Sequence, residues 1–208
     1  MFFIKIFSAK KDFNKNKRVL YKNTIKGSKC SLAGFKEGDE KLTDLIYKLF
    51  NEKETEDFLN PEYIRNRTRA KIRKWIKKKI QSPVDEWYVI KSKGKYIGYI
   101  CFKWREHYDE ACEISTAIEK NFRGLRLGYE SSRILVDYIL SLNKFRYIVG
   151  YAHKQNIKAQ NNLRKLGFRK AQRLQKIVSR QFYNDDGTSA TGSKYILFAV
   201  YSRTIHRK

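Results

Sequence analysis

The stretch ACEISTAIEKNFRGLRLGYESSRILVDYILSL, residues 111–142, decides the fold of this 208-residue chain. Residues 111–118 contain several β-branched residues and predict a β-strand. A short loop with two glycines follows at residues 123–128, and apolar residues then recur at helical spacing up to residue 142. A strand, a glycine loop and a helix in this order bring the N–H groups of the loop and the positive end of the helix dipole to one point, where an anion binds well. By itself, such a loop is more often a simple turn.

A second segment strengthens the interpretation as an anion site. Residues 156–168 read NIKAQNNLRKLGF. Together with the loop, this segment resembles the GNAT superfamily of acetyl-CoA-dependent N-acetyltransferases: the loop is similar to the motif Q/R-x-x-G-x-G/A, and the segment is similar to N-x-x-A/S followed by K-L-G-F. The residues that match the second motif are Asn156, Ala159, Lys165, Leu166, Gly167 and Phe168. The EISTAI run, the loop and Glu130 are most similar to the ribosomal-protein acetyltransferases of the Rim type, and the resemblance covers residues 42–168.

The resemblance implies an α/β fold of the acyl-CoA N-acyltransferase type, in which helices flank a mixed, mostly antiparallel sheet. The hydrophobic patterns agree, because segments typical of strands and helices follow one another along the chain. Helices are predicted at residues 42–51, 63–80 and 157–165, and further strands at residues 30–35, 86–91, 96–104, 146–152, 168–183 and 194–205. We predict one transferase domain at residues 30–208, preceded by a basic N-terminal extension at residues 1–29.

The resemblance also implies that acetyl-CoA binds with its pyrophosphate at the loop. The backbone N–H groups of residues 125–129 are expected to hold the phosphates, with charge added by two arginines. Arg126 departs from the motif, because the family often has glycine there. Asn156 is expected to contact the pantetheine arm, and it is also suited to cap the helix that follows it. The predicted coenzyme contacts are Ala117, Ile118, Arg123, Gly124, Leu125, Arg126, Leu127, Gly128, Tyr129 and Asn156.

Glu113 is the candidate catalytic base. The reaction implied by the resemblance is attack of an amine on the acetyl thioester, and an amine must be neutral to attack. Several family members carry a glutamate on this strand in that role, and the alternative for Glu113 is a carboxylate exposed to solvent. A backbone N–H near Ala117 or Ile118 is expected to stabilise the oxyanion. Many family members use a tyrosine to protonate the thiolate, but that position is Leu163 here, so the sequence provides no general acid.

The charge of the chain is its second strong feature. Lys and Arg number 46 against 21 Asp and Glu, a formal net charge of +25. Nine of the fifteen residues from Arg65 to Lys79 are basic and none is acidic. This segment predicts either an ordinary solvated helix face or contact with an anionic partner, a nucleic acid or an acidic protein. An alternative function is therefore a basic GNAT-fold protein that binds nucleic acid or a ribonucleoprotein, with catalysis secondary or lost.

The sequence leaves the acceptor open. The amine of a protein N-terminus, of a lysine or of a small molecule fits, although the positive charge disfavours polycations.

No apolar run approaches the ~20 residues of a membrane span, so no membrane partner is predicted. Cys30, Cys101 and Cys112 lack paired spacing and the three histidines lack ligand spacing, which predicts free thiols in a reducing compartment and no metal. We therefore expect an intracellular, cytoplasmic protein.

Overall fold

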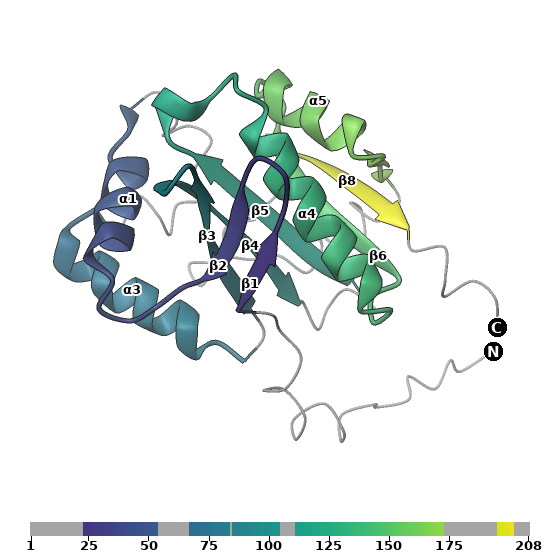
Figure 1. Cartoon of the computed structure of the whole chain (residues 1–208). Coiled ribbons are helices and arrows are strands. Elements are labelled where there is room, and N and C mark those ends of the chain that lie inside the picture. The colour runs from purple at the N-terminus through teal and green to yellow at the C-terminus, as the bar shows by residue number, and fades with distance from the viewer. Residues whose placement is uncertain (1–22, 54–66, 84, 105–110, 173–194, 202–208) are drawn as a thin grey trace, which may run out of the picture.

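The computed structural model describes residues 23–53, 67–83, 85–104, 111–172 and 195–201. The strands in these ranges form one eight-stranded sheet in the order β1–β2–β3–β4–β5–β6–β8–β7 (Figure 1). Neighbouring strands run antiparallel, apart from the parallel pair β5–β6. The strands are β1 (Thr24–Lys26), β2 (Ser31–Gly34), β3 (Asp85–Ser92), β4 (Lys95–Trp104), β5 (Ala111–Ile118), β6 (Tyr147–His153), β7 (Arg169–Lys170) and β8 (Tyr195–Tyr201).

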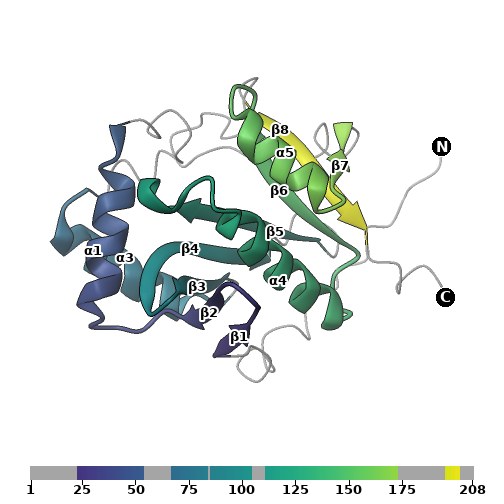
Figure 2. The ribbon, with the colours of Figure 1, turned by 45° about the horizontal axis from the view of Figure 1, so that its top comes forward.

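Helices flank both faces of this sheet. They are α1 (Glu40–Phe50), α3 (Arg69–Gln81), α4 (Leu127–Ser141), α5 (Ile157–Lys165) and the short 3₁₀-helix η2 (Lys120–Phe122). Figures 1 and 2 show α1 and α3 together on one face, and α4 and α5 on the other. The predicted α/β fold with a mixed, mostly antiparallel sheet is confirmed. None of the helices described here is long and apolar enough to cross a membrane.

The alternation of side chains along β3 explains how one sheet supports two cores. Trp87 and Val89 join the cluster under α1 and α3, whereas Tyr88 and Ile90 join the larger cluster under α4. Trp75 of α3 lies edge-on to Trp87 with ring centroids 4.9 Å apart, a geometry that aromatic pairs favour. Aromatic packing therefore fixes α3 to its face of the sheet.

Side-chain caps decide where α1 and α3 begin. Asp39 caps α1 by accepting a hydrogen bond at 3.0 Å from the N–H three residues later. Thr68 caps α3 in the same way at 3.3 Å, so this helix begins at Arg69. The prediction of one helix over residues 63–80 is therefore wrong near its start, because residues 67–68 are not helical; residues 63–66 lie outside the described part.

The edge strand β1 falls within the predicted N-terminal extension. It pairs with β2 in antiparallel register, Thr24 opposite Ala33 and Lys26 opposite Ser31, so it belongs to the sheet. Residues 1–22 lie outside the described part, and the domain boundary at residue 30 stays a prediction.

The strand predicted at residues 168–183 is much shorter where the structure describes it. β7 ends at Lys170, although the N–H of Ala171 still donates to the Leu197 carbonyl at 3.0 Å. The rest of this segment, from residue 173 onward, lies outside the described residues. The other predicted strands and helices agree with the structure to within a few residues where the structure describes them, and residues 202–205 of the strand predicted at residues 194–205 lie outside that part.

Glu86 on β3 leads to a prediction about stability. Burial, with a smaller contribution from the Asp85 carboxylate, raises the pKa of Glu86 from 4.5 to about 7. Because the folded-state pKa is the higher one, ionisation of Glu86 opposes folding: the cost is absent below pH 4.5, grows between pH 4.5 and 7, and is complete above. We expect Glu86→Gln to raise the free energy of unfolding by about 2–3 kcal/mol at pH 8 and to change it little at pH 4.5. Urea unfolding at both pH values measures this, and an equal change at both would contradict it.

Candidate active site

The two parallel strands at the centre of the sheet separate along their length. β5 and β6 are paired from Ala111 opposite Tyr147 to Ile114 opposite Gly150. β5 then continues to Ile118 and β6 to His153 with no further pairing between them, and Figure 2 shows the two strands diverging. The backbone N–H and C=O groups that face this divergence have no ladder partner on the other strand, so an extended ligand can bond to them.

The N-terminus of α4 borders this divergence, because a Cβ at Gly128 would lie 3.4 Å from Cγ1 of Ile118 at the end of β5. Arg126 is the N-cap residue, and its side chain makes no capping hydrogen bond to the first turn. The first helical residues are Leu127, Gly128 and Tyr129, whose N–H groups have no carbonyl one turn earlier within the helix. Orphan donors and the positive end of the dipole together favour an anion here. This is the geometry that the sequence predicts for the pyrophosphate site.

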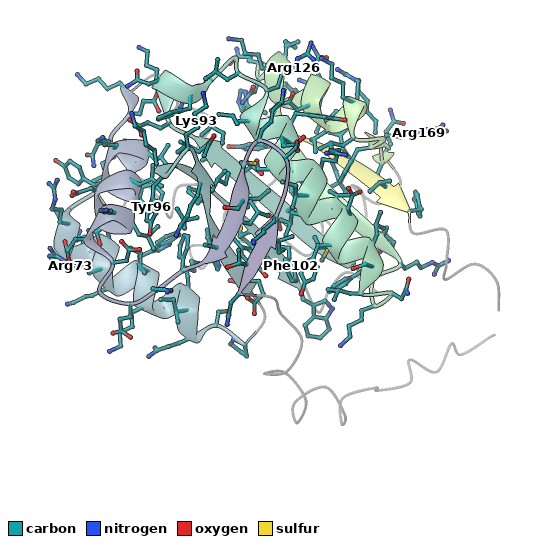
Figure 3. All side chains as sticks on the ribbon, in the orientation of Figure 1. Arg73, Lys93, Tyr96, Phe102, Arg126 and Arg169 are labelled. Atoms are coloured by element: carbon teal, nitrogen blue, oxygen red, sulfur yellow. The ribbon has the colours of Figure 1, made fainter. Side chains whose placement is uncertain are left out.

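The backbone of the loop explains why the family often has glycine at the position of Arg126. Gly124 has φ +83° and Arg126 has φ +61°, both in the left-handed region. A non-glycine residue pays roughly 1–2 kcal/mol for this conformation. The Arg126 side chain is exposed, and Figure 3 shows it at the outer rim beside the start of α4. The loop therefore accommodates an arginine whose side chain points outward.

Arg123 has partners that the sequence did not suggest. Its guanidinium forms a two-pronged ion pair with Glu52, which follows the end of α1. Its Nε also donates to the Ile118 carbonyl at 2.9 Å. Arg123 as a phosphate contact therefore stays a prediction, and Glu52 joins the site as a residue that the sequence analysis missed. No local signal could have found it, because the two residues lie 71 positions apart.

The end of β5 is fixed firmly against β4. Gly98 lies opposite Ile118, and a Cβ at Gly98 would lie 2.2 Å from the Ala117 carbonyl oxygen, so only glycine fits there without a shift. The N–H of Glu119 donates to the Ile97 carbonyl at 2.9 Å. Ala117 and Ile118 therefore border the divergence on a rigid strand, which is where a preorganised oxyanion donor is needed.

Glu113 lies in a row of charged residues that crosses three strands. Asp85 of β3 is opposite Lys103 of β4, and Lys103 is opposite Glu113 of β5. The Lys103 Nζ lies 3.8 Å from Oε1 of Glu113, and these side chains are only 8% and 13% exposed. The alternative of a solvent-exposed carboxylate is therefore wrong. Lys103 is a site residue that the sequence analysis missed. Its signal was a single lysine in an otherwise apolar strand.

Glu113 lies on the face of the sheet that carries α1 and α3. Ala117 packs against the cluster under α1 and α3, whereas Thr116, one position earlier, turns to the other face and lies 3.2 Å from the Ser132 hydroxyl of α4. Glu113 and Ser115 share the face of Ala117. Glu113 is in the paired part of β5, and Ser115 is the first residue beyond the pairing with β6.

The second motif begins just after β6, the strand that faces β5 across the divergence. Asn156 caps α5, because its Oδ1 accepts a hydrogen bond from the Ala159 N–H at 3.0 Å. The predicted cap is confirmed, and a contact with the pantetheine arm would use the amide NH₂ group. Leu163 packs where β5 and β6 part: a Cβ at Gly150 would lie 3.0 Å from Leu163 Cδ2 and 3.7 Å from Ile114 Cγ1. Leu163 is thus a packing residue in this chain.

The cysteines do not form a nucleophilic site. All three are free and buried. Burial raises the pKa of Cys30 to about 11 and that of Cys101 to about 12, and it also raises the pKa of Cys112 well above its ordinary value. A thiol acts as a nucleophile only when ionised, so these side chains are packing residues. Within the ranges that the structure describes, no group of three or more His, Cys, Asp or Glu residues could hold a metal ion.

An uncapped helix N-terminus beside two diverging parallel strands is suited to an anion and to an extended ligand. The sequence matches the acetyltransferase (GNAT) domain family over residues 32–169, which is more than half of the chain. The chain belongs to this family and is an acetyltransferase. No curated protein matches it.

Solved structures with the same fold include three informative relatives. RimL, a ribosomal L7/L12 α-N-protein acetyltransferase in complex with coenzyme A, is 15% identical with a TM-score of 0.66, over 86% of this chain and 97% of RimL. A GNAT-family acetyltransferase from Bacillus anthracis is 13% identical with a TM-score of 0.64, over 86% and 98%. The microcin C7 self-immunity acetyltransferase MccE, in complex with acetyl-CoA and AMP, is 16% identical with a TM-score of 0.62, over 84% and 93%.

Proposed function

We propose that this protein transfers the acetyl group of acetyl-CoA to a primary amine of another protein, at its N-terminus or at a lysine. The observation that carries the proposal is the uncapped N-terminus of α4 next to the diverging strands β5 and β6. The helix end suits the pyrophosphate, and the unpaired strand edges suit the amide groups of the pantetheine arm. RimL, which shares the fold, acetylates an α-amine of a ribosomal protein, and this supports a protein acceptor.

The residues of the site have separate tasks in this reaction. Glu113 takes the proton of the acceptor amine, directly or through a water, while the nitrogen attacks the thioester carbonyl carbon. A backbone N–H near Ala117 or Ile118 stabilises the oxyanion of the tetrahedral intermediate, and collapse of this intermediate breaks the C–S bond. The thiolate then takes a proton from solvent, because the position of the family's tyrosine is held by Leu163. The Lys103 ammonium lies 3.8 Å from the Glu113 carboxylate and is the charged neighbour of the proposed base.

A thiol-release assay tests the proposal. The protein is incubated with acetyl-CoA and a panel of N-terminal peptides, lysine peptides and small amines, and mass spectrometry locates the acetyl group. We expect turnover with peptides and little with polycationic amines, which a chain of net charge +25 repels. Turnover confined to small amines would contradict the protein acceptor, and a lack of acetyl-CoA binding would contradict the function itself.

A second candidate function is the binding of nucleic acid. It depends on which basic residues of α3 lie on the flank that faces away from α1. One flank of α3 forms a ladder of ion pairs with α1 and the turn before it: Arg69 with Asp44 at 2.9 Å, Arg73 with Glu40 at 2.9 Å, and Lys77 with Glu37 at 3.1 Å. Figure 3 shows Arg73 on the outside of α3. The basic residues of this segment therefore do not form one uniform surface, because those on the flank that faces α1 are paired with acidic residues.

The opposite flank of α3 carries the outer lysines, Lys71, Lys74 and Lys78, all of which are exposed. Their spacing of three and four residues puts them on one side of the helix. This flank is the observation that favours an anionic partner. Phosphate contacts release counterions, so binding through it must weaken steeply with salt.

We expect the triple variant Lys71→Gln, Lys74→Gln and Lys78→Gln to lose RNA affinity by about 10-fold in 0.1 M salt and to show a flatter salt dependence. The matched control replaces the three ladder cations, Arg69, Arg73 and Lys77, by glutamine, with the same change in net charge. Fluorescence anisotropy with a short RNA measures both. If the two triple variants bind equally, only the net charge matters, and the outer lysines are a solvated surface.

A further inference from the structure

Two ion pairs join the end of α1 to the segment between β5 and α4. The Arg123 guanidinium donates to both carboxylate oxygens of Glu52, Nη1 to Oε1 at 2.6 Å and Nη2 to Oε2 at 2.5 Å. Its third donor, Nε, reaches the Ile118 carbonyl at 2.9 Å. Lys48 on α1 adds a longer contact, 3.6 Å to Glu119. Arg123 therefore connects the end of α1, the end of β5 and the loop.

The two ion pairs differ in strength. The side chains of Glu52 and Arg123 are 15% and 35% exposed, so the pair is partly withdrawn from water, and its geometry is bidentate. Charge-assisted hydrogen bonds of this kind are roughly twice as strong as neutral ones. Lys48 is 63% exposed and makes one long contact, and such a surface pair contributes little. The attachment of the loop to α1 therefore depends on Glu52.

The position of the loop needs a side-chain contact to fix it, because its backbone contains two residues in the left-handed conformation. Gly124, next to Arg123, and Arg126 both have positive φ. The Arg123 N–H donates to the Lys120 carbonyl at 3.1 Å, which fixes the beginning of the loop. At the end of the loop, the N-terminus of α4 has no side-chain cap. The placement of the loop beside α1 therefore rests on the side chain of Arg123.

We infer that Glu52 is a positioning residue for acetyl-CoA: it holds Arg123 in the two-pronged pair and thereby keeps the loop in the shape that presents its N–H groups to the pyrophosphate. The inference rests on the proposed function. It gives Arg123 a different role from the direct phosphate contact that the motif implies. In the direct-contact alternative, Glu52 competes with the phosphates for the guanidinium, so removal of its charge has the opposite effect on affinity.

The sign of one measurement separates the two roles. We expect Glu52→Gln to weaken acetyl-CoA binding about 10-fold in calorimetry, with kcat nearly unchanged and KM raised. Glu52→Asp keeps the charge on a shorter side chain and is expected to recover part of the affinity. Lys48→Gln is the matched control on α1, with a change within about twofold. An affinity for Glu52→Gln that equals or exceeds that of the parent overturns the inference.

A charge swap gives a second, independent test. Arg123→Glu alone is expected to weaken binding at least 10-fold, because two carboxylates then face each other. The double variant Glu52→Arg with Arg123→Glu restores the ion pair with its charges exchanged, and we expect it to recover most of the lost affinity. If Arg123 contacts the phosphates directly, the double variant stays as weak as Arg123→Glu, and the inference fails.

These results are distinguishable from failure of the proposed function. If the parent protein does not bind acetyl-CoA, the proposed function is wrong and the variants are not informative about Glu52. If the parent binds and the swap does not restore affinity, only the role of Glu52 is wrong. Circular dichroism and thermal unfolding of each variant confirm that the fold is intact, and the swap remains decisive if Glu52→Gln does not fold.

Discussion

Replacement of Gly128 by glutamate is expected to weaken acetyl-CoA binding about 100-fold, which corresponds to about 2.7 kcal/mol. Gly128 lies in the first turn of α4, where no side chain caps the helix. A carboxylate in this turn interacts favourably with the helix dipole, so it competes with the pyrophosphate for the same N–H groups. The fold should tolerate the change, because a Cβ at this position lies 3.4 Å from Cγ1 of Ile118, a contact that a small shift relieves.

Calorimetry with acetyl-CoA measures the effect of Gly128→Glu, and two variants separate its causes. Gly128→Ala adds the Cβ without the charge. Gln81→Glu makes the same change in net charge at the exposed end of α3. Both controls should bind within about threefold of the parent. An unchanged affinity for Gly128→Glu, with the fold intact, would show that the coenzyme binds elsewhere.

Replacement of Glu113 by glutamine is expected to lower kcat about 100-fold at pH 7. The amide cannot take a proton from the acceptor, so the reaction then depends on the fraction of amine that is already neutral. That fraction rises with pH, because a peptide α-amine titrates near 8, and the deficit should shrink toward pH 9. Acetyl-CoA affinity should change little, since Glu113 lies in the paired part of β5 and away from the loop.

The row of charges provides a control for Glu113. Asp85 lies on the other side of Lys103, so Asp85→Asn disturbs the same buried row without touching the proposed base. A pH–rate profile from pH 6 to 9 compares the two variants. If both lose the same activity at every pH, or if Glu113→Gln loses none, Glu113 is a structural residue and the base is another group.

The elements closest to the loop could be predicted from sequence because their signals are local. The helix predicted at residues 157–165 has those bounds in the structure, since Asn156 caps it and Gly167, with φ +85°, follows its end. The strand and helix on either side of the loop were likewise indicated by β-branched residues and by helical spacing of apolar residues.

The contacts that organise the candidate site could not be predicted in this way. Glu52 meets Arg123 across 71 positions, and Lys103 meets Glu113 through the register of two strands. Neither pairing leaves a periodic or motif signal, because each depends on how the elements pack. The sequence indicated a candidate base and a candidate coenzyme loop, whereas the residues that contact them appeared only with the fold.

The ion-pair ladder between α1 and α3 also bears on how this protein can change in evolution. Its side chains are about half exposed, so each pair adds little to stability, and Trp75 already anchors α3. The buried residues Ile72, Trp75 and Ile76 set the rotation of α3 about its axis, and this rotation brings the ladder cations beside α1. A charge reversal at Arg73 alone would face Glu40 with a like charge. Changes on this flank should therefore arise in compensating pairs, in which both partners of an ion pair change together.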